Sequence, residues 1–77
     1  MADVIERNQT HRVDLVPHVV EGSPDPLYSV WVQGRQLVPP TAQPIVRAID
    51  KMQRLGYNGL IEVWSPDKPW LLRVERL

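Results

Sequence analysis

Residues 41–56, TAQPIVRAIDKMQRLG, decide the fold, because they hold the clearest helical pattern in the chain. Thr41 follows two prolines and is placed to cap a helix, and Pro44 falls in the first turn, where its missing N–H does no harm. Gly56 is placed to end the helix as a left-handed C-cap. The apolar side chains at three- and four-residue spacing predict one buried stripe, formed by Ala42, Ile45, Val46, Ile49, Met52 and Leu55.

The opposite side of this predicted helix is polar. It carries Arg47, Lys51 and Arg54, and Asp50 lies four residues before Arg54, a spacing that allows an ion pair. A solvated helix face is the simplest interpretation of these charges. We also take Arg47, Lys51 and Arg54 as a second candidate surface for binding a partner.

Three strands are predicted before the helix, and the first two show clear alternation. Residues 10–16 alternate between apolar and polar side chains, and we expect this strand to end at Pro17 or to lie at a sheet edge there. Residues 21–26, EGSPDP, have the composition of a turn. Residues 27–33 alternate again and form the second strand.

A returning strand is predicted after residue 35. Gly34 and Arg35 fit the two central positions of a hairpin turn, which would set Trp31 opposite Val38. We expect the two prolines at 39 and 40 to stop this strand.

A second hairpin is predicted after the helix, from residues 60–65 and 70–77 joined by a loop at 66–69. The expected register pairs Glu62 with Arg73 as a cross-strand ion pair and Trp64 with Leu71. On the other face it pairs Val63 with Leu72 and Ile61 with Val74. Any slip by one residue would place Glu62 against an apolar side chain, so we expect this register to be specific.

These elements predict an α+β fold, a small antiparallel sheet of four to five strands with one helix packed on one face, in β-ββ-α-ββ order. We expect residues 10–77 to form a single domain and residues 1–9 to fray. One helix can cover one face of such a sheet, which leaves the second face for water or for a partner. The β-branched side of the strands and Trp70 are assigned to the covered face.

The uncovered face is expected to be unusually apolar. It would carry Trp31, Val38, Leu60, Trp64 and Leu71 beside Glu62 and Arg73. Tryptophan and arginine are enriched at binding hot spots. Three interpretations stay open: the N-terminal segment or the loop at 21–26 folds over this face, two copies pair through it, or another protein binds it.

Composition excludes several classes of function. The 77 residues hold nine Lys or Arg and nine Asp or Glu, so the chain lacks the basic balance of a phosphate-neutralising nucleic-acid binder. With no cysteine there is no thiolate catalysis or sulfur-ligated metal. His11, Asp14 and His18 make a poor metal set, because His11 and Asp14 point to opposite faces of a strand. No serine lies in a nucleophile-elbow pattern. We therefore expect no enzyme, no cofactor and no metal.

In size, in the order of its elements over residues 27–77 and in its lack of catalytic residues, the chain resembles the small inhibitors encoded by bacteriophages, including some anti-CRISPR proteins. The resemblance covers architecture and no motif. It implies a non-enzymatic, stoichiometric protein binder, an inhibitor or an adaptor. The alternatives are single-stranded nucleic-acid binding on the same aromatic face and a homodimer or other homo-oligomeric subunit. The N-terminus shows no signal peptide or membrane span, so we expect a soluble cytoplasmic protein.

Overall fold

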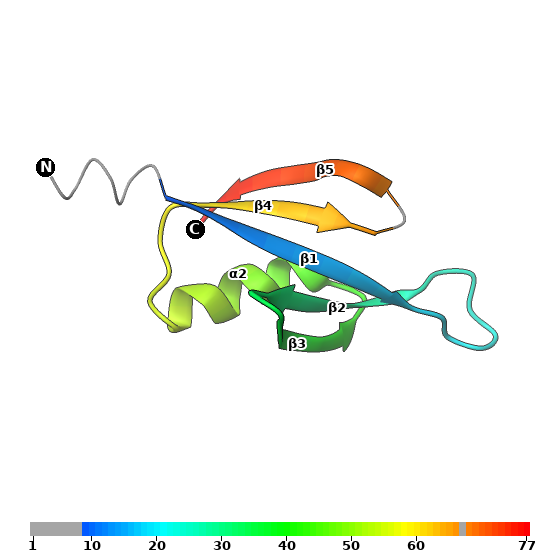
Figure 1. Ribbon diagram of the computed structural model, residues 1–77. Coiled ribbons are helices and arrows are strands. Elements are labelled where there is room, and N and C mark those ends of the chain that lie inside the picture. The colour runs from blue at the N-terminus through cyan, green and yellow to red at the C-terminus, as the bar shows by residue number, and fades with distance from the viewer. Residues whose placement is uncertain (1–8, 67) are drawn as a thin grey trace, which may run out of the picture.

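The computed structural model describes residues 9–66 and 68–77, and of residues 68–72 the backbone alone. Five strands and one helix follow one another along this part of the chain (Figure 1). They are β1 (Thr10–His18), β2 (Leu27–Val32), β3 (Arg35–Thr41), α2 (Pro44–Arg54), β4 (Leu60–Ser65) and β5 (Lys68–Arg76). The predicted α+β class and the order of the elements are confirmed.

All five strands form one sheet in the order β3-β2-β1-β4-β5. β1 lies at its centre, antiparallel to β2 and parallel to β4. The prediction of a wholly antiparallel sheet is therefore wrong for the central pair. α2 explains the parallel pairing, because it carries the chain from the edge strand β3 back across the sheet to the far side of β1 (Figure 1).

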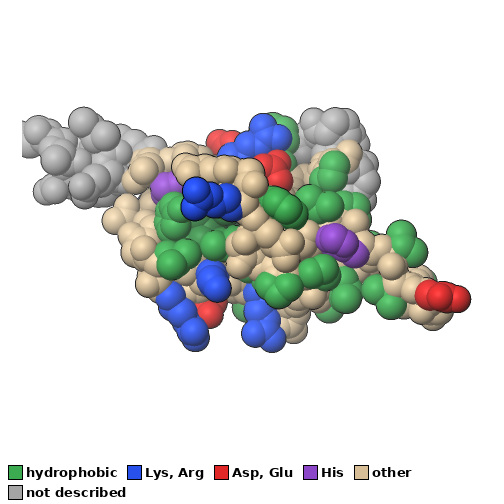
Figure 2. Space-filling view, turned by 60° about the horizontal axis from the view of Figure 1, so that its bottom comes forward, with side chains coloured by type: hydrophobic (Ala, Val, Ile, Leu, Met, Phe, Trp, Pro, Cys, Tyr) green, Lys and Arg blue, Asp and Glu red, His purple; other side chains and the backbone are tan. Residues whose placement is uncertain are grey.

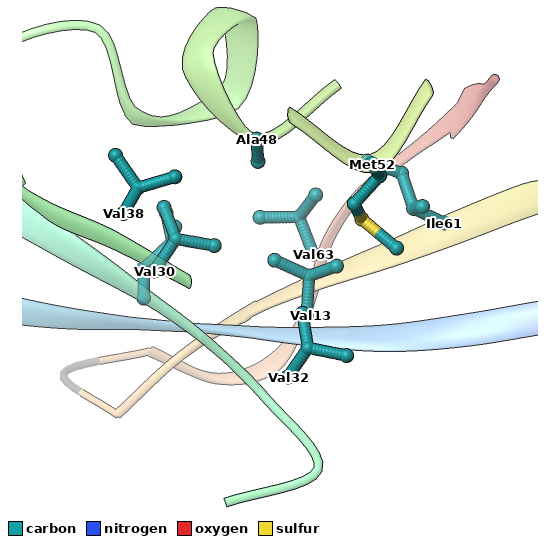
Figure 3. Close-up of a cluster of buried hydrophobic side chains, with 9 residues drawn as sticks. Val13, Val30, Val32, Val38, Ala48, Met52, Ile61 and Val63 are labelled. Atoms are coloured by element: carbon teal, nitrogen blue, oxygen red, sulfur yellow. The ribbon is translucent and has the colours of Figure 1, made fainter. Parts of the chain in front are cut away.

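The hydrophobic core lies between α2 and one face of the sheet (Figure 3). Met52 and Ala48 come down from the helix onto valines of the central strands. Val13, Val30, Met52, Ile61 and Val63 have no exposed surface. The remaining buried core members are Leu15, Val32, Val38 and Ala48.

The predicted C-terminal cap of the helix is confirmed. Gly56 has a φ of +91°, its N–H donates to the Gln53 carbonyl, and the Tyr57 N–H donates to the Met52 carbonyl at 2.9 Å. These two bonds form a Schellman motif. At the other end the N-cap is Gln43, so the prediction of Thr41 as the cap is wrong. Thr41 ends β3 instead, and its Oγ1 accepts a hydrogen bond from the Gln43 N–H at 3.2 Å.

The predicted buried stripe of the helix is only partly right. Ala48 and Met52 are buried and Ile45 and Ile49 pack beside them. Val46 is 63% exposed and Leu55 is 58% exposed, and Ala42 lies before the helix and is exposed. The true stripe is rotated toward Ala48, because the helix rests on the paired strands β2 and β3.

The β2–β3 hairpin turns one residue earlier than predicted. Val32 pairs with Arg35, so the turn residues are Gln33 and Gly34, with φ values of 53° and 76°. Positive φ at both positions matches a type I′ turn, which suits the twist of a two-residue hairpin. A bulge follows the turn, so Val38 pairs with Val30 and its side chain points into the core. The prediction that Val38 lies on the uncovered face is therefore wrong.

The prolines interrupt the strands less than expected. β3 continues through Pro39 and Pro40 because it is an edge strand, so one of the two missing N–H groups is on the outer side. The other falls where the register with β2 shifts between Val38 and Thr41. Pro17 lies inside the central strand β1. There β1 pairs only with β2, since its pairing with β4 ends at Asp14, so Pro17 lies at a local edge.

The β4–β5 register is confirmed at one pair and wrong at the others. Trp64 pairs with Leu71 as predicted, but bulges follow, so that Arg73 pairs with Val63 and Val74 with Glu62. Val74 is therefore 48% exposed rather than buried. The helix packs over β2 and β3, so the same side of β5 lies outside its cover and tolerates the charge of Arg73. The side chains of Trp70, Leu71 and Leu72 lie outside the described residues.

Candidate partner-binding face

The face of the sheet opposite α2 is the candidate site. We call it the open face, since within residues 9–66 and 68–77 every strand belongs to the sheet and the one helix lies on the other side. The register assigns to it the side chains of Thr10, Arg12, Asp14, Val16, His18, Leu27, Ser29, Trp31, Gln36, Leu60, Glu62, Trp64, Val74 and Arg76.

Trp31 and Trp64, the two tryptophans predicted to bind a partner, lie on one row of the open face. Asp14 pairs with Trp31 on β2 and with Trp64 on β4, so the carboxylate lies between the two indoles. Trp31 and Trp64 therefore stand two strand spacings apart, about 10 Å. Both are half-buried rather than covered. The prediction that both lie on the face away from the helix is confirmed.

Arg12 links the charge and the aromatic part of this row. Its Nε lies 3.1 Å from Asp14 Oδ1, and its guanidinium carbon lies 4.9 Å from the centre of the Trp64 ring. The side chains of Arg12 and Asp14 are 65% and 40% exposed. A cation over an indole and an ion pair of this exposure each contribute little to stability, so both groups remain accessible to a partner.

A polar chain fixes the second indole. Trp31 Nε1 donates to Ser29 Oγ at 2.9 Å, and His18 Nε2 lies 2.8 Å from the same oxygen. Ser29 has no exposed surface. The serine and histidine lie close enough to act as a nucleophile and its base, but no substrate carbonyl can reach a fully buried hydroxyl. This pair orients Trp31.

A hollow of about 480 Å³ opens beside Trp64, where β4 leaves β1. The Leu60 N–H donates to the Gln9 carbonyl at 3.0 Å. In a parallel pair, every second residue of a strand points its N–H at the neighbouring strand, so the N–H groups of Leu60, Glu62 and Trp64 point toward β1. The next donor would be residue 66, which is proline and has no N–H. The ladder therefore stops at Trp64. The hollow is lined by Arg12, Asp14, Leu15, Val16, Trp64, Ser65 and Pro66.

The other predicted site residues are divided between the two faces. Glu62 lies on the open face as expected, but its cross-strand neighbour is Val74 and not Arg73. Arg73 lies on the opposite face and pairs with Glu75 at 2.6 Å, so its predicted place beside Trp64 is wrong. Leu71 pairs with Trp64 along the backbone, and its side chain lies outside the described residues.

The second candidate surface is also exposed. Arg47, Lys51 and Arg54 all reach solvent on α2, and Arg54 Nε lies 3.2 Å from Asp50 Oδ2, as the spacing predicts. Figure 2 shows the blue basic side chains as separate projections, divided by green and tan surface, and not as one basic area. Exposed Val46 and Leu55 lie near these charges, but the helix has no aromatic side chain, so we rank its surface below the open face.

The residues weighed as a metal set lie apart. His11 lies on the helix side, where its Nε2 is 3.0 Å from the Asn58 carbonyl and its ring meets Tyr57 edge to face at 4.9 Å. Asp14 and His18 lie on the open face. In the part of the chain that the structure describes, no three His, Asp or Glu side chains gather as metal ligands would.

Sequence reasoning missed the centre of the site. The alternation of residues 10–16 places Arg12 and Asp14 on one side of their strand, but nothing in it places that strand between β2 and β4. The signal was present in the parity of residues 10–16 and 60–65, which match when the two strands run parallel. The strand–helix–strand connection from β3 through α2 to β4 favours a parallel β4, but it does not place β4 beside β1.

Comparison with protein-family models, with curated proteins and with solved structures finds no match. Function therefore has to be inferred from the open face itself. Among the described residues, no helix has the length and apolar character needed to cross a membrane.

Proposed function

We propose that this protein is a small non-enzymatic binding module that contacts another protein through the open face. The observation that carries the proposal is the row Trp31–Asp14–Trp64, in which two half-buried indoles flank one carboxylate on an uncovered sheet. Indole rings supply much contact area for little loss of conformational freedom. The buried Ser29 bond holds one of them in place before a partner arrives.

The charge pattern supports a protein as the partner. Arg12 and Asp14 are paired with one another, and the whole chain has a formal net charge of zero. Single-stranded nucleic acid would need a basic groove along the aromatic face to follow its phosphates. A stoichiometric inhibitor or adaptor in a reducing cytoplasm fits a face whose described side chains include no accessible nucleophile beside a base, and a chain without cysteine.

Affinity capture from the native host, identified by mass spectrometry, tests this function. The wild type should retain a defined protein, and the Trp31→Ala and Trp64→Ala variants should lose it while keeping a wild-type circular dichroism spectrum. Arg47→Glu with Lys51→Glu is the matched control on the helix surface and should keep the partner. Loss of capture in the helix variant alone would move the site to α2, and binding of an oligonucleotide that weakens steeply with salt would replace the proposal with nucleic-acid recognition.

A further inference from the structure

We infer that the open face accepts a second copy of this chain, in a face-to-face dimer organised by Arg12 and Asp14. This inference rests on the proposed function, since it takes the open face to be a protein-binding surface and names its occupant. Three features point to a second copy: the balance of charge across the face, the positions of Arg12 and Asp14 along β1, and the size of the face.

The charges of the open face balance. Its described ionisable side chains other than histidine are Arg12 and Arg76, which are positive, and Asp14 and Glu62, which are negative. A two-fold interface brings one patch against an identical patch, so a face of a single sign repels its own copy. A face with two charges of each sign can satisfy itself. The zero net charge of the whole chain removes the long-range repulsion as well.

The order of the charges along β1 fixes the geometry of the pair. Arg12 and Asp14 are consecutive open-face positions of one strand, about 7 Å apart along it. Consider a two-fold axis that lies midway between the two facing sheets, perpendicular to β1 and above Val13. It places the two copies of β1 over one another in opposite directions. Arg12 of each copy then faces Asp14 of the other. The two intramolecular ion pairs become one network of four charges, with the indoles of Trp31 and Trp64 on either side of it.

The size of the face sets the strength of the dimer. The fourteen open-face positions named above, at about 33 Å² each, cover roughly 450 Å² of flat surface per copy, against about 800 Å² per partner in a standard interface. An interface of this size forms a weak dimer that needs charge complementarity to fix its register. Val74, which is 48% exposed, adds apolar area at the β5 side.

Charge exchange between two variants tests the inference with the full chain. In sedimentation at high micromolar concentration, the wild type should form a dimer, and Arg12→Asp and Asp14→Arg should each be monomeric. An equimolar mixture of the two variants should associate again, because the acidic positions of one then meet the basic positions of the other. The exposed Arg12–Asp14 pair adds little to stability, so at low concentration, where the wild type is monomeric as well, both variants should keep its midpoint of thermal unfolding.

The Asp50–Arg54 pair of α2 supplies the matched control, since it has the same chemistry and similar exposure. Arg54→Asp and Asp50→Arg should leave the dimer intact. A wild type that stays monomeric, or a mixture that does not associate, overturns the dimer. If the wild type is monomeric while Trp31→Ala still abolishes capture of another protein, the dimer is wrong and the proposed function stands. A dimer with no other captured protein supports the second copy as the occupant and removes the foreign partner.

Discussion

The alpha carbon of Gly59 lies so close to the carbonyl oxygen of Gln9 that a Cβ at this position would overlap it. The same carbonyl accepts the Leu60 N–H and opens the parallel ladder between β1 and β4. Gly59 also has a φ of +98°, where residues with a side chain are strained. Both observations require glycine at the start of β4.

Gly59→Ala should destabilise the fold by about 3 kcal/mol, because it combines a positive φ with displacement of a ladder carbonyl. Gly22→Ala is the control, since Gly22 has a φ of +82° and a Cβ added there would meet no atom within 4 Å. It should cost about 1–2 kcal/mol from the backbone alone. Urea unfolding measures both, and equal losses would show that the contact with Gln9 is harmless.

Met52→Ala should lower the free energy of unfolding by about 2–5 kcal/mol. Met52 has no exposed surface and packs between α2 and the sheet, so its truncation leaves a cavity. Leu55→Ala, just after the same helix, should change stability by less than about 1 kcal/mol, because Leu55 is already 58% exposed. Thermal or chemical unfolding followed by far-UV circular dichroism would compare them. A loss for Leu55→Ala as large as that for Met52→Ala would contradict the rotated helix stripe.

Substitution of the two tryptophans by phenylalanine should lower stability by different amounts. Trp31→Phe removes the hydrogen bond to Ser29 Oγ, whereas Trp64 Nε1 is buried and has no hydrogen-bond partner among the described residues. Trp31→Phe should therefore be the more destabilising by about 1 kcal/mol, since Trp64→Phe loses packing but relieves an unsatisfied donor. Denaturant midpoints at equal slope measure this difference. The reverse order would mean that the indole N–H of Trp64 does find an acceptor in solution.

Ser29→Ala should cost about 1–2 kcal/mol, because it leaves the Trp31 N–H without its acceptor on a half-buried face. It should also shift the emission of Trp31, and Trp64→Phe provides the background in which that signal is easier to assign. Ser23→Ala is the control: Ser23 lies in the exposed loop before β2, and its hydroxyl hydrogen-bonds with the backbone of Asp25. An unchanged midpoint for Ser29→Ala would show that the indole is not held by this bond.

Local signals predicted the elements well. The Schellman cap at Gly56, Pro44 in the first helical turn and the alternation of residues 27–32 each depend on neighbours within a few positions. The class and the order of elements followed from them. Strand parity alone placed Trp31 and Trp64 on the face away from the helix.

Registers and strand neighbours were harder to predict, because they depend on distant contacts. The turn at Gln33 needs a non-glycine residue with positive φ, which sequence patterns disfavour. The bulge before Arg73 is tolerated only because the helix stops short of β5. Asp14 lies between two tryptophans only because β1 is the central strand of the sheet. No local pattern in residues 10–16 indicates that central position.

The parallel pairing of β1 with β4 also governs how the chain can reach its native state. The pair Thr10–Leu60 joins positions fifty residues apart, and closing such a loop costs about 1.4 kcal/mol more than closing one of ten residues. The β2–β3 hairpin can form early, but the two central strands meet only after the helix has formed its crossover. During synthesis on the ribosome, β1 can therefore pair with β2 early, but its other edge stays unpaired until β4 has been made.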